Sequence, residues 1–101
     1  MPAYVVNMKH SAESCPLFND VVMNKFKDGM AKREESAKKH NINVITACAV
    51  LLEHLIFYVV EAPSQSAIEE YLKDTGWASF NAAQIREVQF VEDVGKRYGV
   101  L

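Results

Sequence analysis

The chain has 101 residues, a length that allows one domain over residues 1–101 and excludes two independent hydrophobic cores. Half of the residues are hydrophobic and 24% are charged, which is typical of globular proteins and excludes intrinsic disorder. The formal net charge of −2 gives no general attraction to phosphate, so nucleic acid is not an expected partner. No apolar run approaches the roughly 20 residues that span a bilayer, so no membrane partner is expected either.

Residues 3–9 are rich in β-branched and aromatic side chains and predict a strand. A polar turn follows, and Pro16 suits the first position of a helix because proline lacks the N–H that would be unpaired there. Apolar residues at helical spacing then predict a long helix over about residues 16–40. Gly29 is a weak point in it, since glycine costs roughly 1 kcal/mol against alanine inside a helix.

The middle of the chain predicts an antiparallel hairpin. Residues 42–52 and residues 55–61 are two extended apolar runs, separated only by Glu53 and His54. Cys48, inside the first run, is expected to be buried and inert.

A second helix is predicted after Pro63, opened by the capping-box pattern Ser66-x-x-Glu69. Glu69 and Lys73 have the spacing of an ion pair on one helix face, and Gly76 would close the helix. Three of its apolar side chains are expected to face the core: Ile68, Tyr71 and Leu72.

A fourth strand over residues 83–90 and a short tail helix complete the order β-α-β-β-α-β. This order predicts an α+β, ferredoxin-like fold, with a four-stranded antiparallel sheet, two helices on one face and a short C-terminal helix. With only Cys15 and Cys48, the chain is not a disulfide scaffold, and it shows no signal peptide, so a cytoplasmic location is expected.

This topology gathers candidate metal ligands at one edge of the sheet. The end of the first strand meets the start of the third, so His10 and Glu13 would lie near Glu53 and His54, with Cys15 beside them. Histidine nitrogen and cysteine sulfur are the usual ligands of zinc, nickel or copper. The pattern predicts a transition-metal site (Ni or Zn) of His10, Cys15 and His54, with Glu13 or Glu53 as a fourth ligand. The alternative is that the two histidines are simply exposed at hairpin edges.

Cys15 has a second possible role. As the N-cap of a helix that starts at Pro16, it would lie where the helix dipole favours a thiolate, which predicts a reactive or redox-sensing thiol. The alternative is a small polar turn residue without a chemical role.

The sheet face that the helices leave open is a second candidate site. Six aromatic and polar residues could line it and bind a small molecule: Tyr4, Asn7, Tyr58, Trp77, Phe80 and Asn81. The alternative is that the aromatic residues belong to the core or to a dimer interface.

As a pattern of elements, the chain resembles the dimeric α+β-barrel superfamily. The segment Phe57-Tyr58-Val59-Val60-Glu61-Ala62-Pro63-Ser64, a strand that runs directly into the second helix, also resembles small nickel-binding ferredoxin-like proteins. The first resemblance implies a homodimer with a sheet-lined cavity, and relatives use such a cavity to bind or oxidise small organic substrates. The second implies histidines around the second helix, where this chain has Tyr71, Lys73 and Trp77 instead.

Three classes of function are therefore open. The first is a protein that binds a small molecule or a transition metal. The second is a cofactor-independent monooxygenase or isomerase, with His10, His54 or Cys15 as the candidate catalytic group. The third is a non-catalytic structural or regulatory interaction module. No Ser-His-Asp set, glycine-rich phosphate loop or carboxylate pair favours the enzyme.

Overall fold

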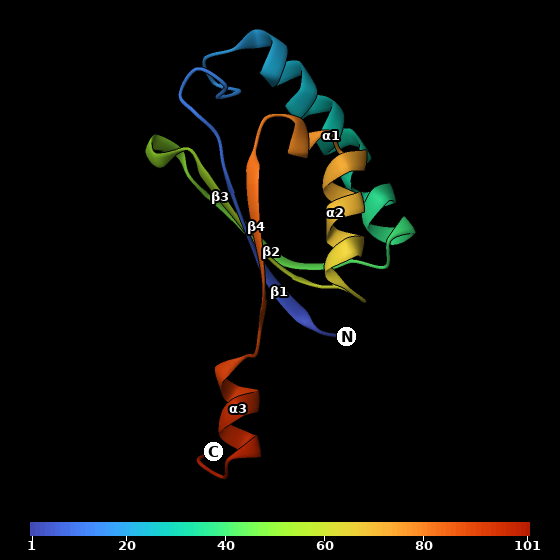
Figure 1. Cartoon of the computed structure of the whole chain (residues 1–101), viewed down its shortest axis with the longest axis vertical. Helices are drawn as coiled ribbons and strands as arrows, with labels where there is room; N and C mark the ends of the chain where they lie inside the picture. Colours follow the sequence, from blue (N-terminus) through green and yellow to red (C-terminus); the bar gives the residue numbers. More distant parts are fainter.

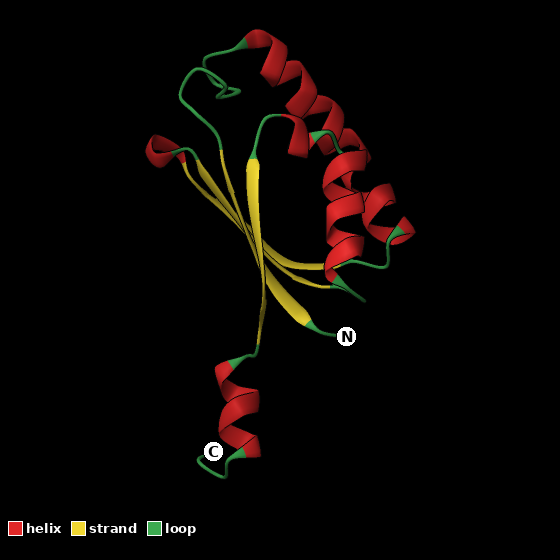
Figure 2. Ribbon diagram, viewed as in Figure 1, coloured by secondary structure: helices red, strands yellow, loops and turns green.

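The computed structural model describes residues 1–101 and confirms the predicted α+β fold, as Figures 1 and 2 show. The strands lie in the order β2–β3–β1–β4, and every neighbouring pair is antiparallel. Helices α1 and α2 lie on the same side of the sheet, whereas α3 projects from the far end of β4. In chain order the helices and strands are β1 (Ala3–Lys9), α1 (Asp20–Lys39), β2 (Asn43–Val50), β3 (Leu55–Glu61), α2 (Gln65–Asp74), β4 (Ala82–Val88) and α3 (Val91–Arg97).

Helix α1 begins at Asp20, four residues later than the sequence predicts. Its N-cap is Asn19, whose side-chain oxygen accepts a hydrogen bond from the N–H of Val22 at 3.1 Å. Asparagine is among the strongest N-caps because its carbonyl satisfies an N–H of the first turn. Cys15 lies in the turns before the helix, so the prediction that it caps α1 is wrong, and the helix dipole gives no support to a reactive thiolate there.

Helix α2 also begins at a different cap. The side-chain oxygen of Ser64 accepts a hydrogen bond from an N–H of the first turn at 3.3 Å, so the capping box expected at Ser66 is wrong. Lys73 forms its ion pair with Glu70 at 3.4 Å rather than with Glu69. The first correction follows from a helix start two residues earlier than expected. The second is a choice between neighbours, since residues three and four positions apart lie on the same helix face.

Strand β2 is at the edge of the sheet, and every residue in it is exposed. Cys48 is therefore exposed, and the prediction that it is buried is wrong. The extended run also ends earlier than residue 52: β2 stops at Val50, and Leu51–Glu53 form a 3₁₀ helix, η1.

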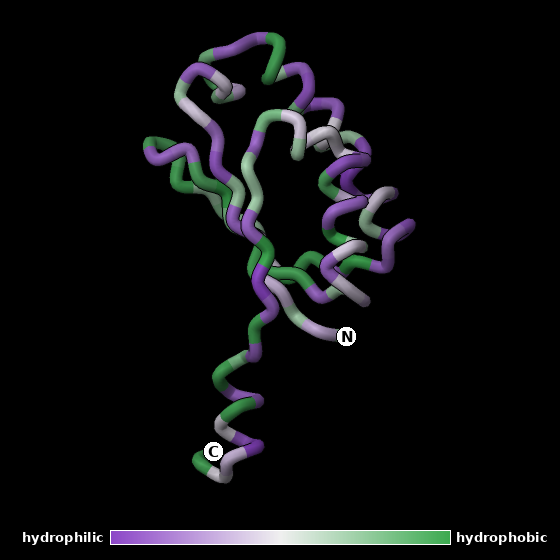
Figure 3. The backbone as a smooth tube through the Cα atoms, in the orientation of Figure 1, coloured by the Kyte–Doolittle hydropathy of each residue, from purple (hydrophilic) through white to green (hydrophobic).

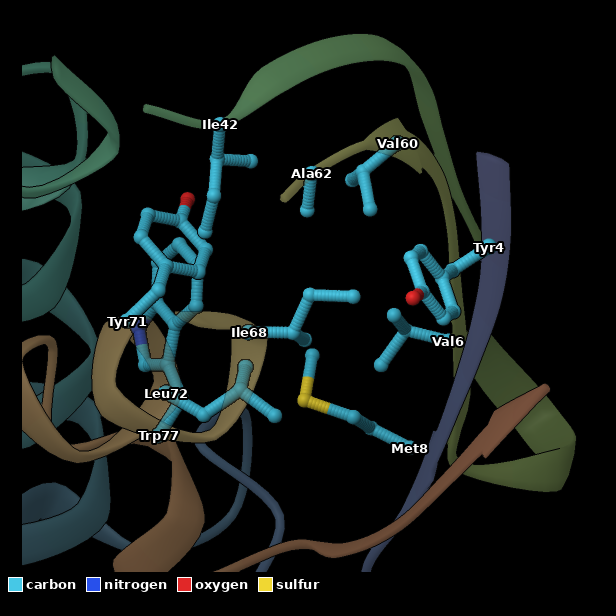
Figure 4. Close-up of a cluster of buried hydrophobic side chains, with 10 residues drawn as sticks. All are labelled: Tyr4, Val6, Met8, Ile42, Val60, Ala62, Ile68, Tyr71, Leu72 and Trp77. Carbon is cyan, nitrogen blue, oxygen red and sulfur yellow. The ribbon is translucent and has the colours of Figure 1, made fainter. Parts of the chain in front are cut away.

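The core lies between the sheet and α2. Figure 4 shows side chains of β1 pointing toward Ile68 and Leu72 of α2, as the sequence predicts for these two residues. Ten buried side chains form the cluster: Tyr4, Val6, Met8, Ile42, Val60, Ala62, Ile68, Tyr71, Leu72 and Trp77.

Helix α1 passes close to Trp77, which belongs to a second 3₁₀ helix, η2 (Trp77–Ser79). A Cβ atom on Gly29 would overlap Trp77 Nε1 and the carbonyl oxygen of Thr75. The low helix propensity of Gly29 is thus offset by the close approach that only glycine permits.

Helix α3 leaves apolar side chains exposed to solvent in the monomer. Figure 3 shows hydrophobic positions along it, although it projects from the body of the domain. Val91 is 84% exposed and Tyr98 is 71% exposed. None of the helices combines the length and the apolar character that crossing a membrane requires.

A polar cluster joins the C-terminal ends of α1 and α2. His40 Nε2 lies 2.6 Å from Asp74 Oδ2, the hydroxyl of Ser36 donates to the same oxygen at 3.3 Å, and Lys39 lies 3.5 Å away. The hydrogen bond from His40 holds the pKa of Asp74 below its ordinary value, although partial burial opposes this shift, and the charges of Lys39 and His40 add to the lowering.

We expect this cluster to make stability fall in acid. Because the pKa of Asp74 is lower in the folded state, its contribution is fully present above the ordinary value of 3.8 and is lost as pH falls through the folded value. Urea unfolding over a series of pH values should therefore show a weaker acid dependence in Asp74→Asn than in the wild type. Asp28→Asn, at an exposed position of α1, is the matched control. Equal pH dependence in both variants would contradict the expectation.

Candidate metal centre

Three candidate ligands come together at one end of the sheet, as the topology predicts. One ring nitrogen each of His10 and His54 and the sulfur of Cys15 lie within 4.8 Å of one another. The antiparallel register of β1 and β3 pairs Lys9 with Leu55, so the residues just beyond these strand ends are neighbours. The backbone N–H of His10 donates to the carbonyl oxygen of His54 at 3.2 Å, which continues the ladder by one rung.

The His10 ring is held in one tautomer by Asn81. The Asn81 side-chain nitrogen donates to the carbonyl oxygen of Trp77 at 3.1 Å, so its oxygen is the atom that faces His10 Nδ1, at 2.9 Å. An amide oxygen only accepts, so Nδ1 carries a proton, and in the neutral ring it is Nε2 that has the lone pair. That Nε2 is buried and has no hydrogen-bond partner. Metal-binding histidines are typically held in this way through their other nitrogen.

His54 has an unusual backbone conformation. It caps η1 in the left-handed region, with φ 57° and ψ 40°, a conformation that costs a residue other than glycine roughly 1–2 kcal/mol. Its Nδ1 is buried without a hydrogen-bond partner, and its ring centroid lies 5.4 Å from that of His10. Backbone strain of this kind concentrates at functional sites.

Two substitutions of His54 separate this strain from the loss of the ring. Both His54→Gly and His54→Ala remove the imidazole, but only glycine adopts a positive φ freely. We expect His54→Gly to be more stable than His54→Ala by about 1–2 kcal/mol in urea unfolding with a chelator present. Equal stability of the two variants would show that the loop relaxes and that the position holds no strain.

Cys15 is the third candidate ligand and lies in the turns between β1 and α1. Its side chain is buried, with only 3% exposed, and it forms no disulfide. A cysteine binds a metal as its thiolate, so the thiol must give up its proton when the ion binds.

The acidic residues expected as a fourth ligand do not join this group. Glu13 and Glu53 are both exposed, and neither carboxylate is close enough to the three other ligand atoms. The prediction of a carboxylate ligand rests on their sequence positions, but Glu13 lies in a turn and Glu53 ends η1, and both extend toward solvent.

The six residues expected to line the open sheet face do not share it. Tyr4 and Trp77 are buried in the core, Tyr58 stacks on Trp77 at 5.8 Å, and Phe80 packs against the same cluster. Asn81 is also buried and serves as the partner of His10. Only Asn7 is on the open face, because it alternates with the core residues Val6 and Met8 along β1.

These aromatic residues therefore do not line a common cavity on the open face. Burial raises the pKa of the Tyr58 phenol far above its ordinary value, and the nearby Tyr71 adds to the shift. Burial raises the pKa of Tyr71 as well, so both phenols remain protonated and neutral at neutral pH.

Similarity to solved structures supports the fold. The chain aligns with SCO4226 from Streptomyces coelicolor A3(2), with a TM-score of 0.55 and 18% identity over 86% of this chain and 96% of that one. It also aligns with an unknown protein from Galdieria sulphuraria, with a TM-score of 0.53 and 13% identity, over 89% of this chain but only 46% of that one. The chain thus spans about half the length of the second protein. At these identities the similarity shows the fold alone. No protein-family model and no curated protein matches the chain.

Proposed function

We propose that this ferredoxin-like domain binds one divalent transition-metal ion through His10, Cys15 and His54. The observation that carries the proposal is the pair of buried ring nitrogens, His10 Nε2 and His54 Nδ1, that have no hydrogen-bond partner beside a buried thiol. Leaving such a group unsatisfied costs roughly 1–3 kcal/mol. Asn7 Oδ1 and Trp77 Nε1 are also buried without a partner, but only the two histidines belong to a group of candidate metal ligands. A metal ion would satisfy both nitrogens at once.

The donor set selects the kind of ion. Two imidazoles and one thiolate suit zinc, nickel or copper, whereas magnesium and calcium require oxygen ligands. Bonds of about 2.0–2.3 Å in a tetrahedral site place ligand atoms roughly 3.3–3.8 Å apart. The three ligand atoms lie within 4.8 Å of one another, so closing onto an ion needs shifts of about 1 Å or less. Such shifts are within the reach of side-chain rotation.

Cobalt(II) titration of metal-free protein tests the proposal, because cobalt replaces zinc and reports its own coordination by colour. We expect one equivalent to bind with the strong visible absorption of a four-coordinate ion and with a sulfur-to-cobalt charge-transfer band from Cys15. Protein that leaves cobalt in its weakly coloured aqueous form, or that shows no sulfur band, would overturn the proposal.

The homodimer expected from the sequence stays a prediction, and two features favour it. The helices cover only one face of the sheet, and the opposite face carries the half-buried apolar side chains Val5, Phe57 and Val59. Helix α3 also projects with exposed apolar side chains. Native mass spectrometry of metal-loaded protein would read the oligomeric state and the number of bound ions together, and a monomer mass would contradict the dimer.

A further inference from the structure

The three proposed ligands form one end of a cavity of about 410 Å³ between α1 and the β2–β3 hairpin. Ten of its fourteen lining residues are hydrophobic, and Lys27 is the only lysine, arginine or acidic residue among them. Met23, Phe26 and Met30 line it from α1, and Ala49 and Ile56 line it from the sheet. The volume lies within the range of about 300–1,000 Å³ that is usual for small-molecule sites.

The cavity exists because the sheet residues opposite α1 are small. Ala49 of β2 lines the cavity and pairs with Ile56, so it points toward the helix side of the sheet. Ala47, which pairs with Tyr58, points to the same side but lies outside the cavity. The small side chain of Ala49 leaves space beneath α1 that a larger side chain would fill. At the mouth of the cavity, Leu17 is 57% exposed and Leu51 is 64% exposed, which gives an apolar entrance.

A metal ion at the end of this cavity would be incompletely coordinated. Three protein ligands leave the fourth position of a tetrahedral site open, as in catalytic zinc sites. Two neutral imidazoles and one thiolate also leave a divalent ion with a net charge of +1. Such a charge is costly beside an apolar cavity unless an anion pairs with it. The chain offers no acidic side chain there, since Glu13 and Glu53 are exposed.

We infer that the fourth ligand is a small, mainly apolar molecule with one anionic donor atom, a thiolate or a carboxylate, whose apolar body fills this cavity. The inference rests on the proposed metal site and names its ligand class. A thiol releases its proton to solvent when its sulfur binds the ion, whereas a carboxylate is already ionised at neutral pH, and no other covalent bond forms or breaks.

Cobalt-loaded protein tests the inference with two pairs of probes. Phenylmethanethiol is compared with 2-mercaptoethanol, and phenylacetate with acetate, by the change in the visible spectrum on titration. In at least one pair the aromatic member should bind roughly tenfold to a hundredfold more tightly, the ratio expected for burying a phenyl ring. The pair that shows the preference identifies the donor atom. Native mass spectrometry checks that the ion stays on the protein.

Filling the cavity provides the matched control. Ala49→Phe places a ring in the cavity and should reduce the preference for the aromatic probe to less than about threefold. Ala31→Phe, at an exposed position of α1 outside the cavity, should keep the wild-type preference.

The outcomes separate the two proposals. Failure to bind cobalt overturns the metal site and the inference with it. Tight cobalt binding with no aromatic preference in either pair, or with an equal preference in Ala49→Phe, overturns the inference and leaves the metal site standing.

Discussion

His10→Ala is expected to lower the affinity for zinc or cobalt by more than about a hundredfold, or about 2.8 kcal/mol. The substitution removes a proposed ligand whose ring is already held in place by Asn81. Loss of an outer-shell partner alone costs roughly 10- to 100-fold in metal affinity, and loss of the ligand itself should cost more. Competition with a chromophoric chelator measures the affinity of folded, metal-loaded protein directly.

The chain contains its own controls for this result. His40 is a partly buried histidine whose Nε2 contacts Asp74, and it lies outside the group, so His40→Ala should leave metal affinity unchanged. Cys15→Ser should weaken binding as His10→Ala does, whereas Cys48→Ser, at the exposed cysteine, should not. Equal losses at His10 and His40, or at the two cysteines, would mean that the ion binds elsewhere or nonspecifically.

Trp77→Ala is expected to lower the free energy of unfolding by about 3–5 kcal/mol, the usual cost of removing a buried large aromatic side chain. Trp77 is 3% exposed, and its ring centroid lies about 6 Å from those of three other aromatic rings. Phe26 comes from α1, Tyr58 from β3 and Tyr71 from α2, so the indole joins three elements. Urea unfolding followed by circular dichroism measures the effect.

The loss should be large compared with the stability of the whole domain, which is typically 5–15 kcal/mol. If Trp77→Ala does not fold at all, Trp77→Phe provides a milder test. It should lower the free energy of unfolding much less, because Trp77 Nε1 has no hydrogen-bond partner to lose. Tyr98→Ala, at the exposed aromatic residue that caps the C-terminal end of α3, should change stability by no more than about 0.5 kcal/mol. A cost at Trp77 no greater than at Tyr98 would show that the aromatic cluster does not stabilise the fold.

The errors in the sequence analysis have two physical causes. At the helix starts, several side chains compete to cap the same turn, and Asn19 and Ser64 succeed over Cys15 and Ser66 because their oxygens reach the first N–H groups. At the sheet, β1 carries apolar residues on both faces, such as Val5 and Val6, so alternation alone does not show which face the helices cover.

In the candidate site, too, some features could be predicted from the sequence and others could not. The meeting of His10 and His54 was predictable, since it follows from strand order and antiparallel pairing. The role of Asn81 was not, because this residue is 71 positions away from His10 and no local pattern connects the two. The buried state of Cys15 likewise depends on how the turns before α1 pack against the rest of the chain.

The sequence by itself determined the order of elements, the strand pairing that follows from it, and the sheet edge at which two histidines and a cysteine gather. These depend on hydrophobic periodicity and turn residues, which act over a few positions along the chain. Only the tertiary structure decided the orientation of the His10 ring, the left-handed backbone of His54 and the apolar cavity beside them. Those features arise from packing between segments distant in sequence, where the fit of side chains in three dimensions decides the outcome.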